Sequence, residues 1–189
     1  MDSVKFRLDG VAPLIMHNSR GADPLNEYAK RLKEVTKKRK KSDEDQMAMS
    51  EIEWESGLYW DDKIGPYIPG INILSAIWEA AKLSKQGKEA KRSFMVVEPK
   101  CRLEYQGPRD LVGLWKAGFK DVRLMRVQMT KVRRTRPSFN EWACEFTLAF
   151  DDSIWNRADV VTLVATCGRY IGLLDGRPVT GRFQSKEVG

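Results

Sequence analysis

The chain has 189 residues, 42% of them hydrophobic and 31% charged, and this balance excludes an intrinsically disordered protein. Lys and Arg number 33 against 26 acidic residues, so the formal net charge of +7 favours a polyanionic partner. No segment reaches the roughly 18 uninterrupted apolar residues of a membrane span, and the first residues lack the apolar stretch of a signal peptide. We therefore expect a cytoplasmic protein with no membrane partner.

Residue types that carry catalysis or bind metals are sparse. The three cysteines, Cys101, Cys144 and Cys167, are odd in number and widely spaced, which argues against a disulfide framework and a zinc site. His17 is the only histidine, and no Ser, Cys or carboxylate lies at a spacing typical of a catalytic triad. The phosphate-binding GxxxxGK[ST] and dinucleotide-binding GxGxxG strings are absent. We expect no cofactor, no metal and no catalytic residue, and cysteines that fill the core.

The N-terminal residues predict a strand followed by a turn and a helix. Apolar residues alternate in part from Val4 to Ile15, and Asp9-Gly10 interrupts them, which indicates a core strand with a bend. Turn-forming residues follow. Asp23 is then predicted to cap a helix that has Pro24 at its first position.

Residues 20–55 are predicted to form a charged helical hairpin inserted into the main domain. Its first helix carries one narrow apolar stripe, made of Leu25, Tyr28, Leu32 and Val35. The basic run 37–41 is typical of a solvated turn, although such a run also suits contact with phosphates. Ser42 then offers a cap for a second helix over about Asp43 to Trp54, with acids in its first turn.

The central part predicts one strongly apolar helix and several strands. The helix has Ile73, Leu74, Ile77, Trp78 and Ala81 on one side. We expect Asn72 to cap this helix and Gly87 to end it. Residues 94–105, 122–132 and 142–150 alternate or are rich in β-formers. The last two are interpreted as one long antiparallel hairpin whose basic tip is the connector 133–141.

The C-terminal part predicts a buried helix from Ala158, ended by Gly172 or Gly176, and a last strand over Arg182 to Val188. The order is therefore strand, insertion, helix, strands, helix, strand. This order is typical of an α+β fold in which two helices pack on one face of an antiparallel sheet.

Two segments carry a resemblance to a known family. The string PYIPGINILSAIWEAAK, residues 66–82, resembles the RAMP superfamily, which includes the backbone subunits of CRISPR effector complexes. There an Ile-Pro-Gly-Ser-Ser sequence starts a helix after a strand. Here Ile68-Pro69-Gly70 matches, and Ile71-Asn72 stands where Ser-Ser is usual. The glycine-rich loop of the family is similar to three Gly-Arg pairs: Gly168-Arg169, Gly176-Arg177 and Gly181-Arg182.

The resemblance implies a ferredoxin-like, RRM-related fold, with residues 1–189 as a single domain that grips nucleic acid along its backbone. Some family members cut RNA with an Asp in the loop after the first strand, where Asp23 stands here. The Asp23-Pro24 pair favours a helix cap instead. Without the family, Pro69-Gly70 is a turn before a core helix, and the later glycines are turn residues.

Three groups of cations are candidates for binding phosphates. Lys and Arg side chains neutralise phosphates, aromatic rings stack on bases, and a guanidinium beside glycine amides holds a phosphate. The candidates are Arg126, Lys131, Arg133, Arg134, Arg136 and the ring of Phe139 in the predicted hairpin; Lys91 and Arg92 after the central helix; and Arg169, Arg177 and Arg182 in the Gly-Arg segment. The alternative is that these are solvated turns, with Trp142 and neighbouring rings packed in the core.

The leading hypothesis is a non-catalytic protein that binds single-stranded DNA or RNA, encoded by a phage or mobile element and coating its ligand as a homo-oligomer. The alternative is a protein-interaction factor, such as a viral inhibitor of a host effector complex or a self-assembling structural protein, whose marker would be an exposed apolar stripe on the helical insertion. A metal-dependent nuclease ranks last, because the pairs Asp61-Asp62 and Asp151-Asp152 are typical of turns.

Overall fold

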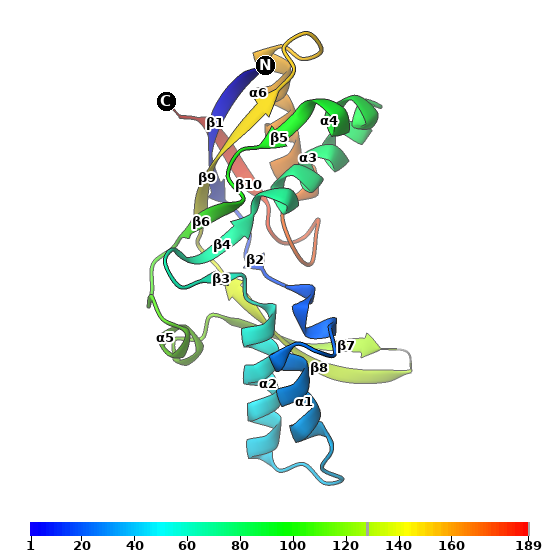
Figure 1. The fold of residues 1–189 in the computed structure, drawn as a ribbon, viewed down its shortest axis with the longest axis vertical. Coiled ribbons are helices and arrows are strands. Elements are labelled where there is room, and N and C mark those ends of the chain that lie inside the picture. Colours follow the sequence, from blue (N-terminus) through cyan, green and yellow to red (C-terminus); the bar gives the residue numbers. More distant parts are fainter. Residues whose placement is uncertain (128, 189) are drawn as a thin grey trace. The chain divides into compact units, whose positions relative to one another are not determined.

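The computed structural model describes residues 1–127 and 129–188, and the chain divides into two compact units (Figure 1). Unit 1 comprises Met1–Leu14, Trp60–Gln106 and Asn140–Gly189, and unit 2 comprises Ile15–Tyr59 and Gly107–Phe139. Helices and mostly antiparallel strands occur together, which confirms the predicted α+β class. A single domain over residues 1–189 stays a prediction.

Unit 1 is built on an antiparallel sheet with strand order β10-β1-β9-β6-β4-β3, in which β5 also pairs with β9. The strands are β1 (Asp2–Gly10), β3 (Trp60–Asp61), β4 (Gly65–Pro69), β5 (Phe94–Val96), β6 (Lys100–Glu104), β9 (Ala143–Phe150) and β10 (Phe183–Glu187). The chain passes from β1 through α3 to β6 and β9, and then through α6 to β10. The predicted first and last strands are confirmed as β1 and β10.

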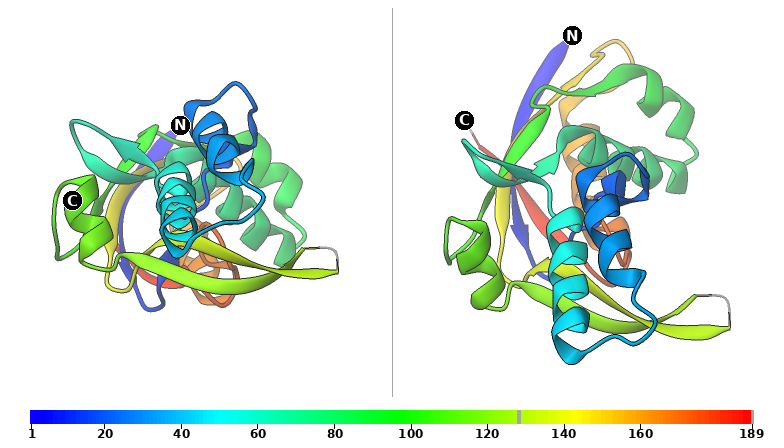
Figure 2. Two further views of the ribbon diagram at one scale, coloured as in Figure 1. Left: turned by 90° about the horizontal axis from the view of Figure 1, so that it is seen from below. Right: turned by 60° about the horizontal axis from the view of Figure 1, so that its bottom comes forward.

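Two long helices cover one face of this sheet (Figures 1 and 2). They are α3 (Gly70–Leu83) and α6 (Arg157–Thr166), which contact one another, and a π-helical turn (Cys167–Ile171) extends α6. The short helix α4 (Gly87–Ser93) packs on α3. The predicted C-terminal helix is therefore present, and it ends at Gly172, whose φ is 75°.

Alternation along the strands decides which side chains enter the core of unit 1. In β1, Val4, Phe6 and Leu8 are buried while the residues between them face outward. Phe6 stacks on Phe146 of β9 with ring centroids 5.6 Å apart. Apolar residues at every second position thus bury one face of the sheet beneath α3 and α6.

The Ile68-Pro69-Gly70 string joins β4 directly to α3. Pro69 is the N-cap and uses no side-chain hydrogen bond, so the predicted cap at Asn72 was wrong. Gly70 donates its N–H to Pro99 O at 3.0 Å, and a Cβ at this position would collide with Glu98 O. Glycine is therefore required here because another backbone segment approaches closely. Gly87 begins α4, whereas α3 ends at Leu83.

Unit 2 contains the predicted helical hairpin and a β-hairpin (Figure 1). Its elements are η1 (Ser19–Ala22), α1 (Glu27–Thr36), α2 (Asp43–Gly57), α5 (Leu111–Lys116), β7 (Lys120–Val127) and β8 (Thr130–Phe139). The short strand β2 (Leu14–Ile15) includes the first residue of unit 2 and is the third strand of the sheet β2-β8-β7.

Local capping decides where the two long helices of unit 2 begin. Asn26 caps α1 by accepting the Tyr28 N–H, so the predicted start at Asp23-Pro24 was wrong; the Asp23 carboxylate accepts the Leu25 N–H in the turn before the helix. The predicted cap at Ser42 is confirmed, and Ser42 and Asp45 together form a capping box at the start of α2.

The predicted hairpin between residues 122–132 and 142–150 was wrong. β7 pairs with β8, with Arg126 opposite Lys131 and Arg123 opposite Arg134, whereas β9 pairs with β1, β5 and β6 in unit 1. Residues 133–136 therefore lie within strand β8 and not in a connecting tip. Gln128 is outside the described residues. The strand partners are decided by the apolar inner face of β9, which completes the core of unit 1.

All three cysteines are buried in unit 1. Burial raises the pKa of the Cys101 and Cys167 thiols to about 12, so both are neutral at physiological pH. Their predicted role as small core residues is confirmed.

Candidate nucleic-acid interface

The excess positive charge of the chain lies entirely in unit 2. Unit 1 has 15 Lys and Arg and 15 Asp and Glu, whereas unit 2 has 18 and 11, which accounts for the whole formal charge of +7. Within unit 2, residues 15–59 have nine cations and nine acids, and residues 107–139 have nine cations and two acids. The predicted basic run 37–41 is thus offset by acids of its own segment, while the β-hairpin segment is not.

The outer half of the β7–β8 hairpin presents three exposed cations. Arg126 and Lys131 lie directly opposite one another in the register, and Arg133 follows two residues later on the same face of β8. Lys131 and Arg133 form no ion pair with any other residue that the structure describes. Figure 2 shows this part of the hairpin extending away from α1 and α2. We call Arg126, Lys131 and Arg133 the hairpin cations.

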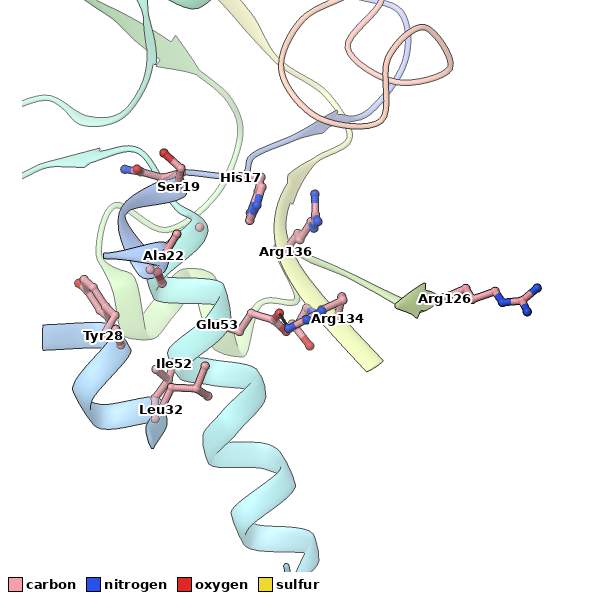
Figure 3. Close-up of a pocket in the computed structure, with 16 residues that line it drawn as sticks. His17, Ser19, Ala22, Tyr28, Leu32, Ile52, Glu53, Arg126, Arg134 and Arg136 are labelled. Carbon is pink, nitrogen blue, oxygen red and sulfur yellow. Dashed lines mark hydrogen bonds and ion pairs between the residues drawn. The ribbon is translucent and has the colours of Figure 1, made fainter. Parts of the chain in front are cut away.

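The inner half of the hairpin is tied to helix α2 by Glu53. The Arg134 Nη1 atom donates to Glu53 Oε1 at 2.8 Å, and the backbone N–H of Thr135 donates to Glu53 Oε2 at 2.8 Å (Figure 3). One carboxylate therefore neutralises Arg134 and also satisfies a strand N–H. Arg134 and Arg136 are half-buried at this position.

Phe139 does not provide the predicted ring for stacking on bases. It is 0% exposed and packs on Phe119 with ring centroids 5.4 Å apart. It is also the only aromatic residue between positions 120 and 139. The exposed apolar side chains of the hairpin are instead the aliphatic Val122, Leu124 and Met129. The hairpin therefore offers charge and aliphatic surface.

Two other cations at the base of the hairpin have partners within unit 2. Arg123 pairs with Asp121 at 2.5 Å, and the Lys120 ammonium lies 3.7 Å from the centre of the Trp115 ring. The pairing of Arg123 reduces its contribution to the field of the hairpin, and the contact of Lys120 fixes the start of β7 on α5.

The arginines of the Gly-Arg segment make contacts inside unit 1. Arg177 pairs with Glu79 of α3 at 3.0 Å, and Arg182 Nε donates to Pro178 O at 2.6 Å. Arg169 is exposed, 6.0 Å from the ring of Tyr170. Gly181 has a φ of 68°, and a Cβ there would collide with Leu173 O. This glycine therefore serves the backbone turn of the loop.

The cations after the central helix lie on α4 and have nearby partners. Arg92 is 3.6 Å from Glu89 in an exposed i,i+3 pair, and the Lys91 ammonium lies 5.8 Å from the centre of the Trp78 ring. Both cations are in the last turn of the helix, where they interact favourably with its dipole. Residues 82–92 contain five cations and one acid, so this part of unit 1 is locally basic although the charge of the unit is balanced overall.

The outer face of the unit 1 sheet is a network of ion pairs. Arg7 contacts Asp9 at 2.9 Å, Glu104 at 2.9 Å and Glu145 at 3.5 Å, and Lys186 contacts Asp9 at 3.0 Å. These residues belong to four neighbouring strands. With Lys5, which contacts Glu145 at 2.8 Å, these cations and acids are equal in number, so the network supplies no excess of cations. One aromatic ring, that of Tyr67 in β4, lies on the same face, with the Lys100 ammonium 5.3 Å from its centre.

The network predicts a specific response to acid. The hydrogen bond from Lys186, and next that from Arg7, lowers the pKa of Asp9 below its usual value. This stabilisation is complete above the unfolded-state pKa of about 3.9 and is lost as the pH falls through the lower folded-state pKa. We expect the melting temperature to fall between pH 5 and 2, and to fall less in Lys186→Met, which lacks the main partner. Differential scanning calorimetry at several pH values measures this effect. An equal fall of the melting temperature with pH in the two proteins would contradict the prediction.

The predicted acidic pairs have structural partners. Asp61 is held by Lys100 at 2.5 Å, which lowers its pKa to about 2, and Asp152 lies 3.0 Å from the N-terminal amine. Asp151 accepts from both the N–H and the hydroxyl of Ser153. No group of three metal-binding side chains occurs among residues 1–127 and 129–188. Within the same residues, no helix combines the length and apolar character that a membrane crossing requires.

Sequence reasoning missed Glu53 and Arg20, which organise unit 2. Arg20 donates to the carbonyl oxygens of Ser56, Glu55 and Leu58 at 3.0, 2.6 and 3.2 Å, so it satisfies the C-terminal carbonyls of α2. Its guanidinium also covers the Tyr28 ring at 4.4 Å. Neither role has a local sequence signal, because the partners are more than 30 residues apart.

No protein-family model matches the chain, and a comparison with curated protein sequences also gives no match. The interpretation of the hairpin therefore depends on its own charge and geometry.

Proposed function

We propose that the protein binds single-stranded DNA or RNA along its phosphate backbone, through the hairpin cations of unit 2, and performs no chemistry. One observation carries the proposal. The segment that contains the hairpin has nine cations and two acids, whereas unit 1 and the helical segment of unit 2 are each balanced. A localised excess of this kind attracts a polyanion, whereas dispersed and paired charges do not.

The composition of the hairpin also indicates which parts of the nucleic acid the protein contacts. Because Phe139 is buried, base stacking on this surface is not available, and binding relies on phosphate contacts. Phosphate contacts are nearly independent of sequence and depend strongly on salt. We therefore expect weak sequence preference and similar affinity for DNA and RNA.

The test is a titration of fluorescently labelled oligo-dT and oligo-U, followed by anisotropy at several salt concentrations between 50 and 300 mM. Each phosphate contact on a single strand contributes a slope of about −0.7 to the plot of log affinity against log salt, so three cations predict a slope of about −2. A duplex of equal length tests the preference for single strands. No binding at 50 mM salt, or an affinity that is independent of salt, would overturn the proposal.

We further propose that unit 1 is a ferredoxin-like domain related to the RAMP superfamily. The support is its order β10-β1-β9-β6 combined with the connections β1-α3-β6 and β9-α6-β10, which follow the β-α-β-β-α-β scheme. The glycine requirement at Gly70 is consistent with the Ile-Pro-Gly resemblance. The same proposal includes three further points. Several copies of the protein coat one strand, the protein acts in the bacterial cytoplasm, and a phage or mobile element encodes it.

The protein-interaction alternative keeps one supporting observation. Leu25 is 77% exposed, whereas Tyr28, Leu32 and Val35 of the same predicted stripe are half-buried. The anisotropy titration distinguishes the two functions, because a factor that acts only through protein contacts does not bind oligonucleotides at low salt.

A further inference from the structure

Unit 2 contains a cavity of about 440 Å³ between its helices and strand β8 (Figure 3). This volume is within the range of about 300–1,000 Å³ that small-molecule sites occupy. The wall includes the segment before α1, parts of α1 and α2, and the inner half of the β-hairpin. The outer, exposed part of the hairpin extends beyond it; Figure 3 shows the Arg126 side chain, which borders the cavity, pointing away.

One side of the cavity is cationic. His17, Arg134 and Arg136 line this side, and Figure 3 shows Arg134 further along β8 than Arg136. The contact with Glu53 at 2.8 Å holds the Arg134 guanidinium in a defined orientation while its other N–H groups remain for further bonds. A guanidinium fixed in this way suits the bidentate binding of a phosphate.

The other side of the cavity is largely apolar. Leu32, Ile52 and the ring of Tyr28 lie there, on α1 and α2 (Figure 3). Small ligands bind where an apolar wall meets a few convergent polar groups, and this cavity combines both. The residues that line the cavity therefore suit a molecule with an anionic end and an apolar or aromatic body.

We propose that this cavity binds an organic phosphate, with the phosphate at the wall that His17, Arg134 and Arg136 line and an aromatic or apolar body against Leu32 and Ile52. A nucleoside monophosphate has this chemistry, and it has two sources: a free nucleotide, or the 5′-terminal nucleotide of a strand bound elsewhere on the protein. Of the hairpin cations only Arg126 borders the cavity, and its side chain points away from it, so the proposal does not depend on the proposed function.

Isothermal titration calorimetry with AMP, adenosine and inorganic phosphate tests the site. We expect AMP to bind more tightly than either part alone, because both walls then have contacts. Arg136→Gln is expected to weaken AMP about tenfold or more, the usual loss for a hydrogen bond to a charged group. Lys40→Gln with Lys41→Gln, at exposed positions of unit 2 outside the cavity wall, is the charge control and leaves AMP affinity unchanged.

Oligonucleotides with and without a 5′-phosphate distinguish the two sources. A preference for the phosphorylated strand that Arg136→Gln abolishes supports the terminal nucleotide, and binding of AMP without such a preference supports the free nucleotide. Failure of the folded wild type to bind AMP at millimolar concentration, together with indifference to the 5′-phosphate, overturns the proposal. Strand binding through the hairpin cations is unaffected by that failure.

Discussion

Replacement of the three hairpin cations, Arg126, Lys131 and Arg133, by glutamine is expected to weaken the binding of single-stranded oligonucleotides by about 10- to 100-fold at low salt. The three side chains are exposed on the outer half of the hairpin and contribute little to packing. Removal of three phosphate contacts should also reduce the slope of log affinity against log salt by about 2. Anisotropy titrations at several salt concentrations measure both effects.

The matched control is Arg39, Lys40 and Lys41→Gln, which removes the same charge from an exposed part of unit 2. That run is followed by the acids at the start of α2, and Lys38 pairs with Asp45 at 2.5 Å. We expect the control to change affinity about threefold or less, through the net charge alone. Equal losses for the two triple variants would show that total charge, and not the hairpin, governs binding.

Trp54→Ala is expected to destabilise unit 2 by about 3–5 kcal/mol, the usual loss for truncating a buried tryptophan. Trp54 is 1% exposed, its Nε1 donates to Phe119 O at 2.7 Å, and its ring meets Trp115 edge-on at 5.6 Å. One side chain therefore joins α2 to the segment that leads into the β-hairpin. Urea denaturation followed by circular dichroism gives the free energy of unfolding.

Two further variants make the Trp54 prediction specific. Trp54→Phe keeps a ring but leaves Phe119 O without its donor, so a loss of about 1–2 kcal/mol is expected. Trp60→Phe, at a half-buried position on the edge strand β3, should cost about 0.5 kcal/mol. Hydrogen exchange should increase in unit 2 for Trp54→Ala. A loss below 1 kcal/mol in that variant would mean that the tryptophan is not a core residue of unit 2.

The separation of charge between the two units bears on the functional proposal. A sheet that binds RNA in the manner of an RRM presents cations and aromatic rings on its open face. Here that face is occupied by the ion pairs of Arg7 with Asp9, Glu104 and Glu145. The excess cations lie on a separate hairpin. If the proposed function holds, the sheet of unit 1 supports folding, and unit 2 contacts the ligand.

Local patterns were sufficient for several elements. The Ser42 cap, the basic turn before it and the second helix of the insertion follow from hydrogen bonds within a few residues, so the sequence predicts them closely. The start of α1 was wrong by a few residues, because Asn26, Asp23 and other nearby side chains all have capping ability. The short helix α5 was not predicted, although Asp110 caps it by accepting the Gly113 N–H.

The candidate site depended on which strands pair. The sequence indicates strands near 122–132 and 142–150, but alternation alone does not choose between neighbours, since every exposed strand edge has the same hydrogen-bonding groups. Strand β9 belongs to the sheet of unit 1, beneath α3 and α6, and the partner of β7 is therefore β8. Arg133, Arg134 and Arg136 consequently alternate between the two faces of one strand and are not gathered at a tip.

By itself, the sequence determined the α+β composition, the helical insertion, the buried cysteines and the concentration of cations in residues 107–139, because these depend on residue type and short-range periodicity. Only the tertiary structure decided that Phe139 is buried, that Arg134 and Arg177 are neutralised by Glu53 and Glu79, and that a cavity lies beside β8. The physical reason is that burial and ion pairing are set by residues distant in the chain, which no local pattern specifies.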